Sequence, residues 1–274
     1  MNTPGSVLIL ALLGLSPVAG LAGGPSQVAP EPAMQAPVVT GSENRLSFTI
    51  LGGVSLSPDY FGAQDSSVGP NFGISNLGLS WGRAQFGSHE VTTPAPGFDL
   101  HGSFRFISAR EAAENVELTG LSDIDASAEL GLGVGYTGGF YRAFADVRYG
   151  VVGHEGVAGE VGADLFWSAS DDLIFSAGPR VQFGNAQFSN TYFGVTAAES
   201  GPSGLAAYTA GGGIYGAGVE IGATYRLNAD WGLQGSATWT RLQGDAKDSP
   251  IVAQGDSDQF GLKLGLTRRI TFGF

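Results

Sequence analysis

The sequence predicts an all-β fold, a single antiparallel transmembrane β-barrel of the kind found in the outer membrane of bacteria. Three observations predict it. Apolar and polar residues alternate over stretches long enough to cross a bilayer, only 14% of the residues are charged, and short connections alternate with long ones. Ordinary globular proteins carry about 25% charged residues. Low charge, 45 glycines and scattered aromatics fit strands with one face toward lipid and the other toward a polar interior.

The first 44 residues precede the alternating pattern. Residues 1–22 resemble a secretory signal peptide, because a short apolar core at residues 7–15 is followed by proline and small residues. That core is too brief to span a membrane as a helix. Residues 23–44 are rich in Pro, Ala, Gly and Ser, and we expect a flexible periplasmic tail. The barrel is expected over residues 45–274.

Strands follow one another from residue 45 to the end. Residues 258–274 show the pattern well, since Phe260, Leu262 and Leu264 share a face while Gly261 and Lys263 take the other. Crossing a bilayer at a tilt needs roughly 9–11 residues. We count ten strands directly: residues 45–57, 68–86, 98–106, 123–136, 141–151, 157–167, 173–183, 219–227, 231–241 and 258–274. Residues 68–86 are poorly patterned and leave room for a further hairpin.

The connections orient the barrel. Tight turns fall at residues 137–139, 168–172 and 228–230, and longer links at 57–67, 108–122, 185–210 and 243–257. Outer-membrane barrels place short turns in the periplasm and long loops outside. Both termini are then periplasmic, which requires an even number of strands. The exception is residues 153–156, a short turn on the outer side.

The polar faces carry charges that should pair or meet water inside an enclosed lumen. We expect Arg142 to pair with Asp146, and Glu160 with Arg180. Eight inward charges are expected to occlude a narrow lumen through ion pairs: Arg105, Glu129, Arg142, Asp146, Arg148, Glu160, Asp164 and Arg226. Lys263 and Arg269 of the last strand are also expected to face the charged lumen. Arg268 is an exception on the apolar face of the last strand. The net charge of −12 argues against nucleic acid as a partner.

Several loop-edge segments form a recognisable series: residues 57–62, Arg110, 120–125, 153–156, 178–179, 192–195, 203–205 with Tyr208, and 241–251. Taken together and in this order, they resemble the MipA/OmpV family of outer-membrane proteins. Residues that match the family's motifs, which we interpret as structural, are Pro58, Asp59, Tyr60, Gly62, His154, Gly156, Tyr192, Phe193, Gly194, Gly244, Asp245, Asp248, Ser249 and Pro250. The resemblance implies about twelve strands, against the ten counted directly, and residues 68–97 diverge from it.

The resemblance also implies a function. The family is named for a protein that interacts with a lytic transglycosylase, and membership implies a non-enzymatic scaffold that links a murein hydrolase to a penicillin-binding protein. Other expected partners are outer-membrane lipid, lipopolysaccharide and the barrel-assembly machinery, for which Phe272 and Phe274 would be the assembly signal. A narrow channel for small solutes is the alternative function. An outer-membrane hydrolase is the third hypothesis.

Candidate chemistry is sparse. His101 shares an inward face with Asp99, as a catalytic pair would, but no Gly-x-Ser-x-Gly elbow is present. His154, beside Glu155, is interpreted as an interfacial turn residue because no second metal ligand lies at a recognisable spacing. The acidic loop residues lack the spacing of a calcium loop and are expected to be solvated, or to stabilise a turn: Asp245, Asp248, Asp256 and Asp258. No catalytic residue, cofactor or metal site is predicted.

Overall fold

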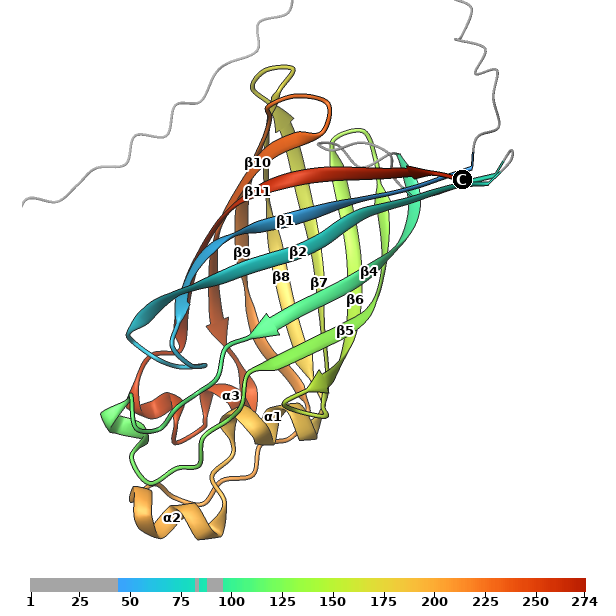
Figure 1. Cartoon of the computed structure of the whole chain (residues 1–274). Helices are drawn as coiled ribbons and strands as arrows, with labels where there is room; N and C mark the ends of the chain where they lie inside the picture. The colour runs from blue at the N-terminus through green and yellow to red at the C-terminus, as the bar shows by residue number, and fades with distance from the viewer. Residues whose placement is uncertain (1–43, 82–83, 88–95) are drawn as a thin grey trace, which may run out of the picture. The chain divides into compact units, whose positions relative to one another are not determined.

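The strands of the protein form one antiparallel sheet in the computed structural model, which describes residues 44–81, 84–87 and 96–274 (Figure 1). These residues belong to one compact unit, Gly41–Phe274. The signal peptide predicted at residues 1–22, and the tail predicted at 23–44 apart from Asn44, lie outside the described residues. No helix in the described part of the chain is long and apolar enough to cross a membrane.

The sheet curls into the wall of a barrel with the order β3-β2-β1-β11-β10-β9-β8-β7-β6-β5-β4. Its strands are β1 (Arg45–Pro58), β2 (Ser66–Trp81), β3 (Ala84–Gly87), β4 (Gly97–Ile107), β5 (Ser127–Thr137), β6 (Tyr141–Val152), β7 (Val157–Ser168), β8 (Leu173–Gly184), β9 (Gly213–Arg226), β10 (Trp231–Leu242) and β11 (Asp258–Gly273). Ten are long, as counted from the sequence, and β3 has only 4 residues. The described residues therefore hold eleven strands instead of about twelve.

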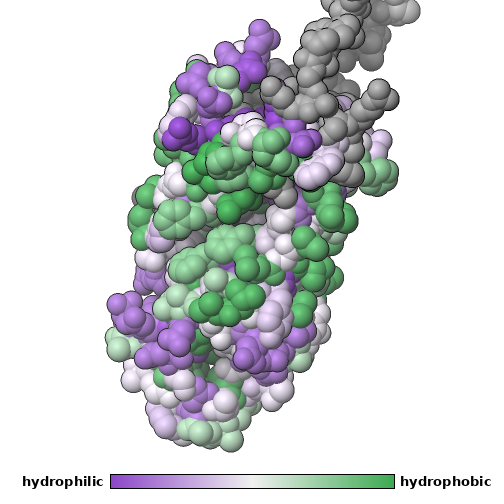
Figure 2. Space-filling view, turned by 45° about the vertical axis from the view of Figure 1, so that its right-hand side comes forward, coloured by the Kyte–Doolittle hydropathy of each residue, from purple (hydrophilic) through white to green (hydrophobic). Residues whose placement is uncertain are grey.

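The outward face of the wall is apolar. Alternate side chains of each long strand point away from the lumen, and large apolar ones among them are exposed, such as Phe98, Leu132 and Leu264. Figure 2 shows these side chains as a hydrophobic band over the middle of the strands, with hydrophilic residues toward both ends. Exposure of so much apolar surface to water would be costly, whereas lipid covers such a band in a membrane barrel. The predicted fold class is confirmed.

A β-bulge in β2 explains why residues 68–86 lacked a clear pattern. Ser47 of β1 pairs with Gly78 while Thr49 pairs with Ser75, so two residues of β2 lie opposite one residue of β1. One of the two, Asn76, has a positive φ of 51°. A bulge shifts the alternation by one residue. Before the bulge, the even-numbered side chains of β2 face outward, as Phe72 does. After the bulge, the odd-numbered side chains face outward, as Trp81 does.

The long connections gather at the end of the barrel opposite the C-terminus (Figure 1). We call them the cap: residues 59–65, 108–126, 185–212 and 243–257. Its helical elements are η1 (Val116–Leu118), α1 (Ala186–Phe193), α2 (Ala197–Ser203), α3 (Gly244–Lys247) and η2 (Val252–Gln254). The tight turns lie at the other end, so the alternation of short and long connections predicted from the sequence is confirmed.

The core of the protein lies in the cap and not between two layers of sheet. Phe61 packs against the rings of Tyr192 and Phe193, with centroids 5.1 and 5.5 Å away. Phe188 and Phe193 are fully buried. The same cluster includes residues of β7, β9 and β10, among them Ala158, Tyr215 and Leu242. The cap therefore spans the end of the lumen.

A charge on the outward face should destabilise the barrel much more than the same charge inside. Leu132 lies outward near the middle of β5, and Ser236 lies inward near the middle of β10. Arginine facing lipid at the bilayer midplane costs about 2–4 kcal/mol. We expect Leu132→Arg to lower the free energy of unfolding by about that amount, and Ser236→Arg by under about 1 kcal/mol. Urea titration of the barrel in lipid vesicles measures both, and equal losses would contradict the assignment of faces.

Candidate functional site

The lumen beneath the cap is organised around a buried carboxylate, Glu129 of β5. Its side chain is 0% exposed and accepts hydrogen bonds at 2.6 and 2.8 Å from Arg105 of β4. Arg148 of β6 donates to it at 3.0 Å. Arg105 also donates to the hydroxyl of Tyr215 at 2.6 Å. A desolvated charge is tolerated only when it is paired and hydrogen-bonded, and here both guanidinium groups meet that need.

His154 lies in the turn between β6 and β7, as predicted, but its buried ring completes this cluster and does not face the interface. Its ring is fully buried, and Nε2 lies 2.9 Å from Oε1 of Glu129. The amide N–H of Gly156 donates to Nδ1 at 3.0 Å, so the proton is on Nε2 and the ring is neutral. Burial lowers the pKa of His154, against the raising effect of Glu129. The error arose because spacing along the chain does not reveal a partner in another strand.

A second set of contacts lies on the wall from β4 to β6 and joins side chains of these two strands across β5. His101 lies between two carboxylates, with Nδ1 2.7 Å from Asp99 and Nε2 2.9 Å from Asp146. Ser103 donates to Asp146 at 2.9 Å, and not to His101. Both ring nitrogens are therefore occupied, and His101 is not placed to take a proton from a serine as a hydrolase would require. The described residues contain no cluster of three or more His, Cys, Asp or Glu that could hold a metal ion.

One predicted pair is wrong and one is confirmed. Arg142 donates to Asp99 at 3.1 Å and not to Asp146, because four residues of a strand span roughly 13 Å, whereas neighbouring strands bring side chains together. Arg180 lies 3.7 Å from Glu160, as predicted, and closer to Asp164 at 2.7 Å and Glu220 at 3.0 Å. Inward charges therefore neutralise one another across strands and occupy much of the lumen.

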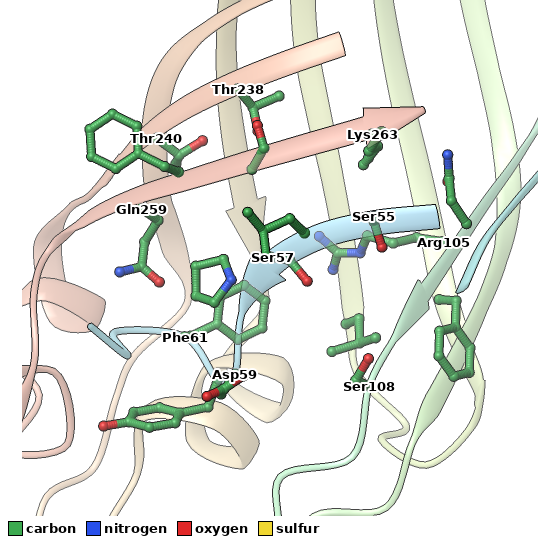
Figure 3. A pocket seen from close by; sticks show the side chains of 18 of the residues that line it. Ser55, Ser57, Asp59, Phe61, Arg105, Ser108, Thr238, Thr240, Gln259 and Lys263 are labelled. Carbon is green, nitrogen blue, oxygen red and sulfur yellow. The ribbon is translucent and has the colours of Figure 1, made fainter. Parts of the chain in front are cut away.

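A cavity of about 330 Å³ lies between the cap and the wall (Figure 3). Figure 3 shows hydroxyl, amide and charged groups around it, which come from β1, β4, β10, β11 and the cap. The labelled residues are Ser55, Ser57, Asp59, Phe61, Arg105, Ser108, Thr238, Thr240, Gln259 and Lys263. This volume is at the lower end of the range of small-molecule sites, roughly 300–1,000 Å³. The cavity is the candidate site.

The motif residues from the first part of the cap lie where they hold it together. Tyr60 is 6% exposed and donates to Glu117 at 3.0 Å, and its burial raises the pKa of its hydroxyl. The amide of Gly62 donates to Gln259 at 3.0 Å, and its φ of 101° favours glycine. Pro58 ends β1, and Asp59 follows it beside the cavity. A Cβ on Gly156 would lie 2.5 Å from the amide nitrogen of Phe188.

The later motif residues join α1 to the link between β10 and β11. Ser249 is fully buried and donates to the carbonyl of Phe193 at 2.7 Å. Tyr192 donates to Ser127 at 3.0 Å, and Gly194 ends α1. Asp245 accepts a hydrogen bond from the amide of Gly211 at 2.6 Å instead of folding back on Ser249. Gly244, with a φ of 52°, is the first residue of α3, and Asp248 directly follows the last residue of that helix. Pro250 follows Ser249 in the same link.

The last strand resolves one anomaly of the sequence. Arg268 faces outward, and its guanidinium lies 5.0 Å from the centre of the Trp231 ring on β10. Such a cation–π contact suits the interface between lipid and water, where aromatic residues gather. Phe272 packs at 6.1 Å from Phe48, and Phe274 at 5.7 Å from Trp81. Their role as an assembly signal stays a prediction.

Comparison with known proteins identifies the family. The family model described as MltA-interacting protein MipA matches residues 50–270. The chain belongs to this family. The MltA-interacting proteins of Escherichia coli (strain K12) and Shigella flexneri are each 32% identical to it over 88 residues. That alignment covers 32% of this chain and 35% of each relative, so the chain spans about a third of the curated relatives it matches.

Solved outer-membrane proteins share only a distant likeness. The outer membrane protein OprG of Pseudomonas aeruginosa is 10% identical, with 84% of this chain and 98% of that chain covered and a TM-score of 0.31. OmpT of Vibrio cholerae is 9% identical, with 85% of this chain and 99% of that chain covered and a TM-score of 0.31. A bacterial polysaccharide outer membrane secretin is 10% identical, with 82% of this chain and 98% of that chain covered and a TM-score of 0.37. Family membership and the apolar outward wall place this MipA-family barrel in the outer membrane.

Removing the charge of Glu129 should destabilise the barrel strongly. In Glu129→Gln, Arg105 and Arg148 stay in the lumen without their common carboxylate, and breaking a buried ion pair costs about 3–5 kcal/mol. The lower stability should appear as a lower urea concentration at the midpoint of unfolding. On heating, the folded form, which migrates differently in electrophoresis, should disappear at a lower temperature than in the wild type. Glu155→Gln, which changes an exposed carboxylate one residue from His154, is the control and should leave both unchanged. An unaffected Glu129→Gln would contradict the central role of this group.

Glu199 should make the cap sensitive to acid. Burial alone would raise its pKa, but hydrogen bonds from Ser122 and Thr196 outweigh burial and lower it to about 2, from 4.5. Because the folded pKa is the lower one, this stabilisation is present above about pH 4.5 and is lost as the pH falls toward about 2. Glu199→Gln should speed proteolysis of the cap near neutral pH, and the difference from the wild type should shrink over that window. Glu114→Gln, which changes an exposed carboxylate, is the control. A difference in proteolysis between Glu199→Gln and the wild type that does not change with pH would contradict the lowered pKa of Glu199.

Proposed function

We propose that the protein is a non-enzymatic outer-membrane scaffold that holds a murein transglycosylase at the cell envelope. The observation that carries the proposal is the match to the MltA-interacting protein family over residues 50–270. The curated relatives carry the same name, which describes an interaction with MltA. A penicillin-binding protein as a second partner rests on the family resemblance alone.

The lumen supports binding over transport or catalysis. Ion pairs on β4 to β9 occupy the wall, and the aromatic cluster of the cap spans the end of the lumen. His101, a candidate general base in the described wall, is held by two carboxylates and is already engaged. A protein of this kind offers surfaces to partners more readily than a path to solutes.

A partner on the cell-wall side would meet the end opposite the cap. That end carries the tight turns between β5 and β6, β7 and β8, and β9 and β10, at residues 138–140, 169–172 and 227–230. Outer-membrane barrels place such turns in the periplasm. These turns are short, so the N-terminal segment at residues 23–43 is the other candidate for the docking element.

Affinity recovery from envelope extracts tests the scaffold. The full protein should recover murein transglycosylase activity, and a variant that lacks residues 23–43 but keeps residues 1–22 should recover much less. A control variant with Glu155→Gln, on the cap side, should recover as much as the wild type. Equal recovery with and without the segment would exclude it as the docking element. Failure of every form to recover the enzyme would overturn the scaffold.

Conductance separates the scaffold from the channel alternative. In planar bilayers the protein should show no stable open steps, because the cap and the ion pairs obstruct the lumen. Deletion of the aromatic cluster of α1, by Phe188→Ala together with Phe193→Ala, is the matched variant in which leak should rise. Steady open steps from the wild type would favour a channel.

A further inference from the structure

The wall of the barrel contains a seam between β2 and β4. These strands lie side by side, yet no ladder joins them, and β2 and β4 stand at or near the two ends of the strand order. The short strand β3 pairs only with Ser80, Trp81 and their neighbours at one end of β2. Among the described residues, the edge of β2 before that point and the whole outer edge of β4 therefore have no strand partner.

An unpaired edge is unusual in a membrane. Backbone N–H and C=O groups that face hydrocarbon without a partner cost several kcal/mol each, and closed barrels avoid this by pairing every strand. A seam of this kind is stable only where side chains, water or a bound molecule cover the edge. It is also the place where the wall opens at the lowest cost, because no ladder must break.

The cavity of the candidate site reaches this seam and passes through it. Its lining includes inward groups such as Ser55 and Lys263, and also Phe72 of β2 with Phe104 and Phe106 of β4. The three phenylalanines belong to the outward face, with exposures of 66%, 40% and 45%. One continuous space is thus lined by polar groups inside the barrel and by aromatic groups that face lipid.

Near the cap, a glycine of β2 approaches the serine that follows β4. A Cβ atom added to Gly69 of β2 would lie 3.9 Å from Oγ of Ser108, which follows β4. The approach is close enough for side-chain contact but leaves the backbone edges unpaired. Small residues therefore flank the seam at this point, while Phe72, Phe104 and Phe106 line the space that passes through it.

The charges that line the cavity favour an anion. Arg105 is already paired with Glu129, while Lys263 has no ion-pair or hydrogen-bond partner among the described residues. Arg110 adds a further cation, and Asp59 is the carboxylate of the lining on the cap side. Lys263 is exposed. A neutral ligand lying against it would desolvate an unpaired ammonium group, whereas an anionic group would pair with it.

We propose that this cavity binds a single-chain anionic amphiphile, a fatty acid from the surrounding membrane, which enters through the β2–β4 seam. The carboxylate lies at Lys263 inside the barrel, and the alkyl chain passes the seam to lie against Phe72, Phe104 and Phe106. A soluble anion would gain nothing from the three aromatic groups. A neutral lipid would leave the ammonium group unpaired.

Binding of a spin-labelled fatty acid to the full protein in lipid nanodiscs tests the headgroup. Lys263→Ala should weaken binding about fivefold or more, since charge-assisted hydrogen bonds are the strong ones, and Lys263→Arg should retain most of it. Lys247→Ala is the matched control, because Lys247 is the chain's other lysine and does not line the cavity. The methyl ester of the same probe should bind the wild type as weakly as the acid binds Lys263→Ala.

A reversible crosslink tests the route. The chain has no cysteine, so Gly69→Cys together with Ser108→Cys places a single pair of thiols across the seam, where a Cβ at position 69 would lie 3.9 Å from Oγ of Ser108. Oxidation should slow uptake of the probe at least tenfold, and reduction should restore it, while the single variants should behave as wild type. Heat-modifiable mobility confirms that each variant is folded.

Either experiment can overturn the proposal. Equal binding of acid and ester, or no effect of Lys263→Ala, would remove the anionic amphiphile as the ligand. Unchanged uptake in the oxidised pair would remove the seam as the route. Neither result depends on the transglycosylase, so failure here and failure of the proposed scaffold are distinguishable.

Discussion

The structure depends first on the pairing of one carboxylate that has no access to water. Glu129 joins β5 to Arg105 of β4 and Arg148 of β6, and through His154 to the turn between β6 and β7. A slip of one residue in any of these strands would turn a charge toward lipid, so the network fixes the register at the cap end. Replacing such networks by apolar residues is often neutral for stability, so what Glu129 contributes is a unique alignment of strands and cap.

The cap rests on this alignment. Phe188 of α1 lies over the guanidinium of Arg105, with the ring centre 5.3 Å away, and its ring is also 5.3 Å from His154. Tyr192 of the same helix reaches Ser127 at the start of β5. The aromatic cluster therefore packs on the paired charges and not on a conventional apolar core, which explains why the buried residues gather at one end of the barrel.

The sequence was sufficient for the wall because the alternation of side chains reports directly which face meets lipid. It was insufficient where one residue disturbs that alternation: the bulge at Asn76 hid the course of β2, and the 4-residue β3 carries too little pattern to be seen.

The contacts of the candidate site were harder to predict than the strands. Inward charges such as Arg105 and Glu129 were predicted as inward, but their partners lie on neighbouring strands, so the pairing of Arg142 and the burial of His154 required the register. Tyr215 and the seam gave no signal in the sequence, since a missing ladder leaves the strands themselves unchanged.

The geometry separates the parts of the protein that different partners would meet. Motif residues such as Tyr60 and Ser249 are buried in the cap, where they hold loops together, and so present little surface to another protein. A partner in the periplasm would approach the opposite end, while a lipid would approach the wall between β2 and β4. A molecule bound at the seam would contact β1 and β11 through Ser55 and Lys263, and β1 begins where the N-terminal segment joins the barrel. β1 is paired on both edges, with β2 and with β11, so it runs beside the seam strand β2 along its length.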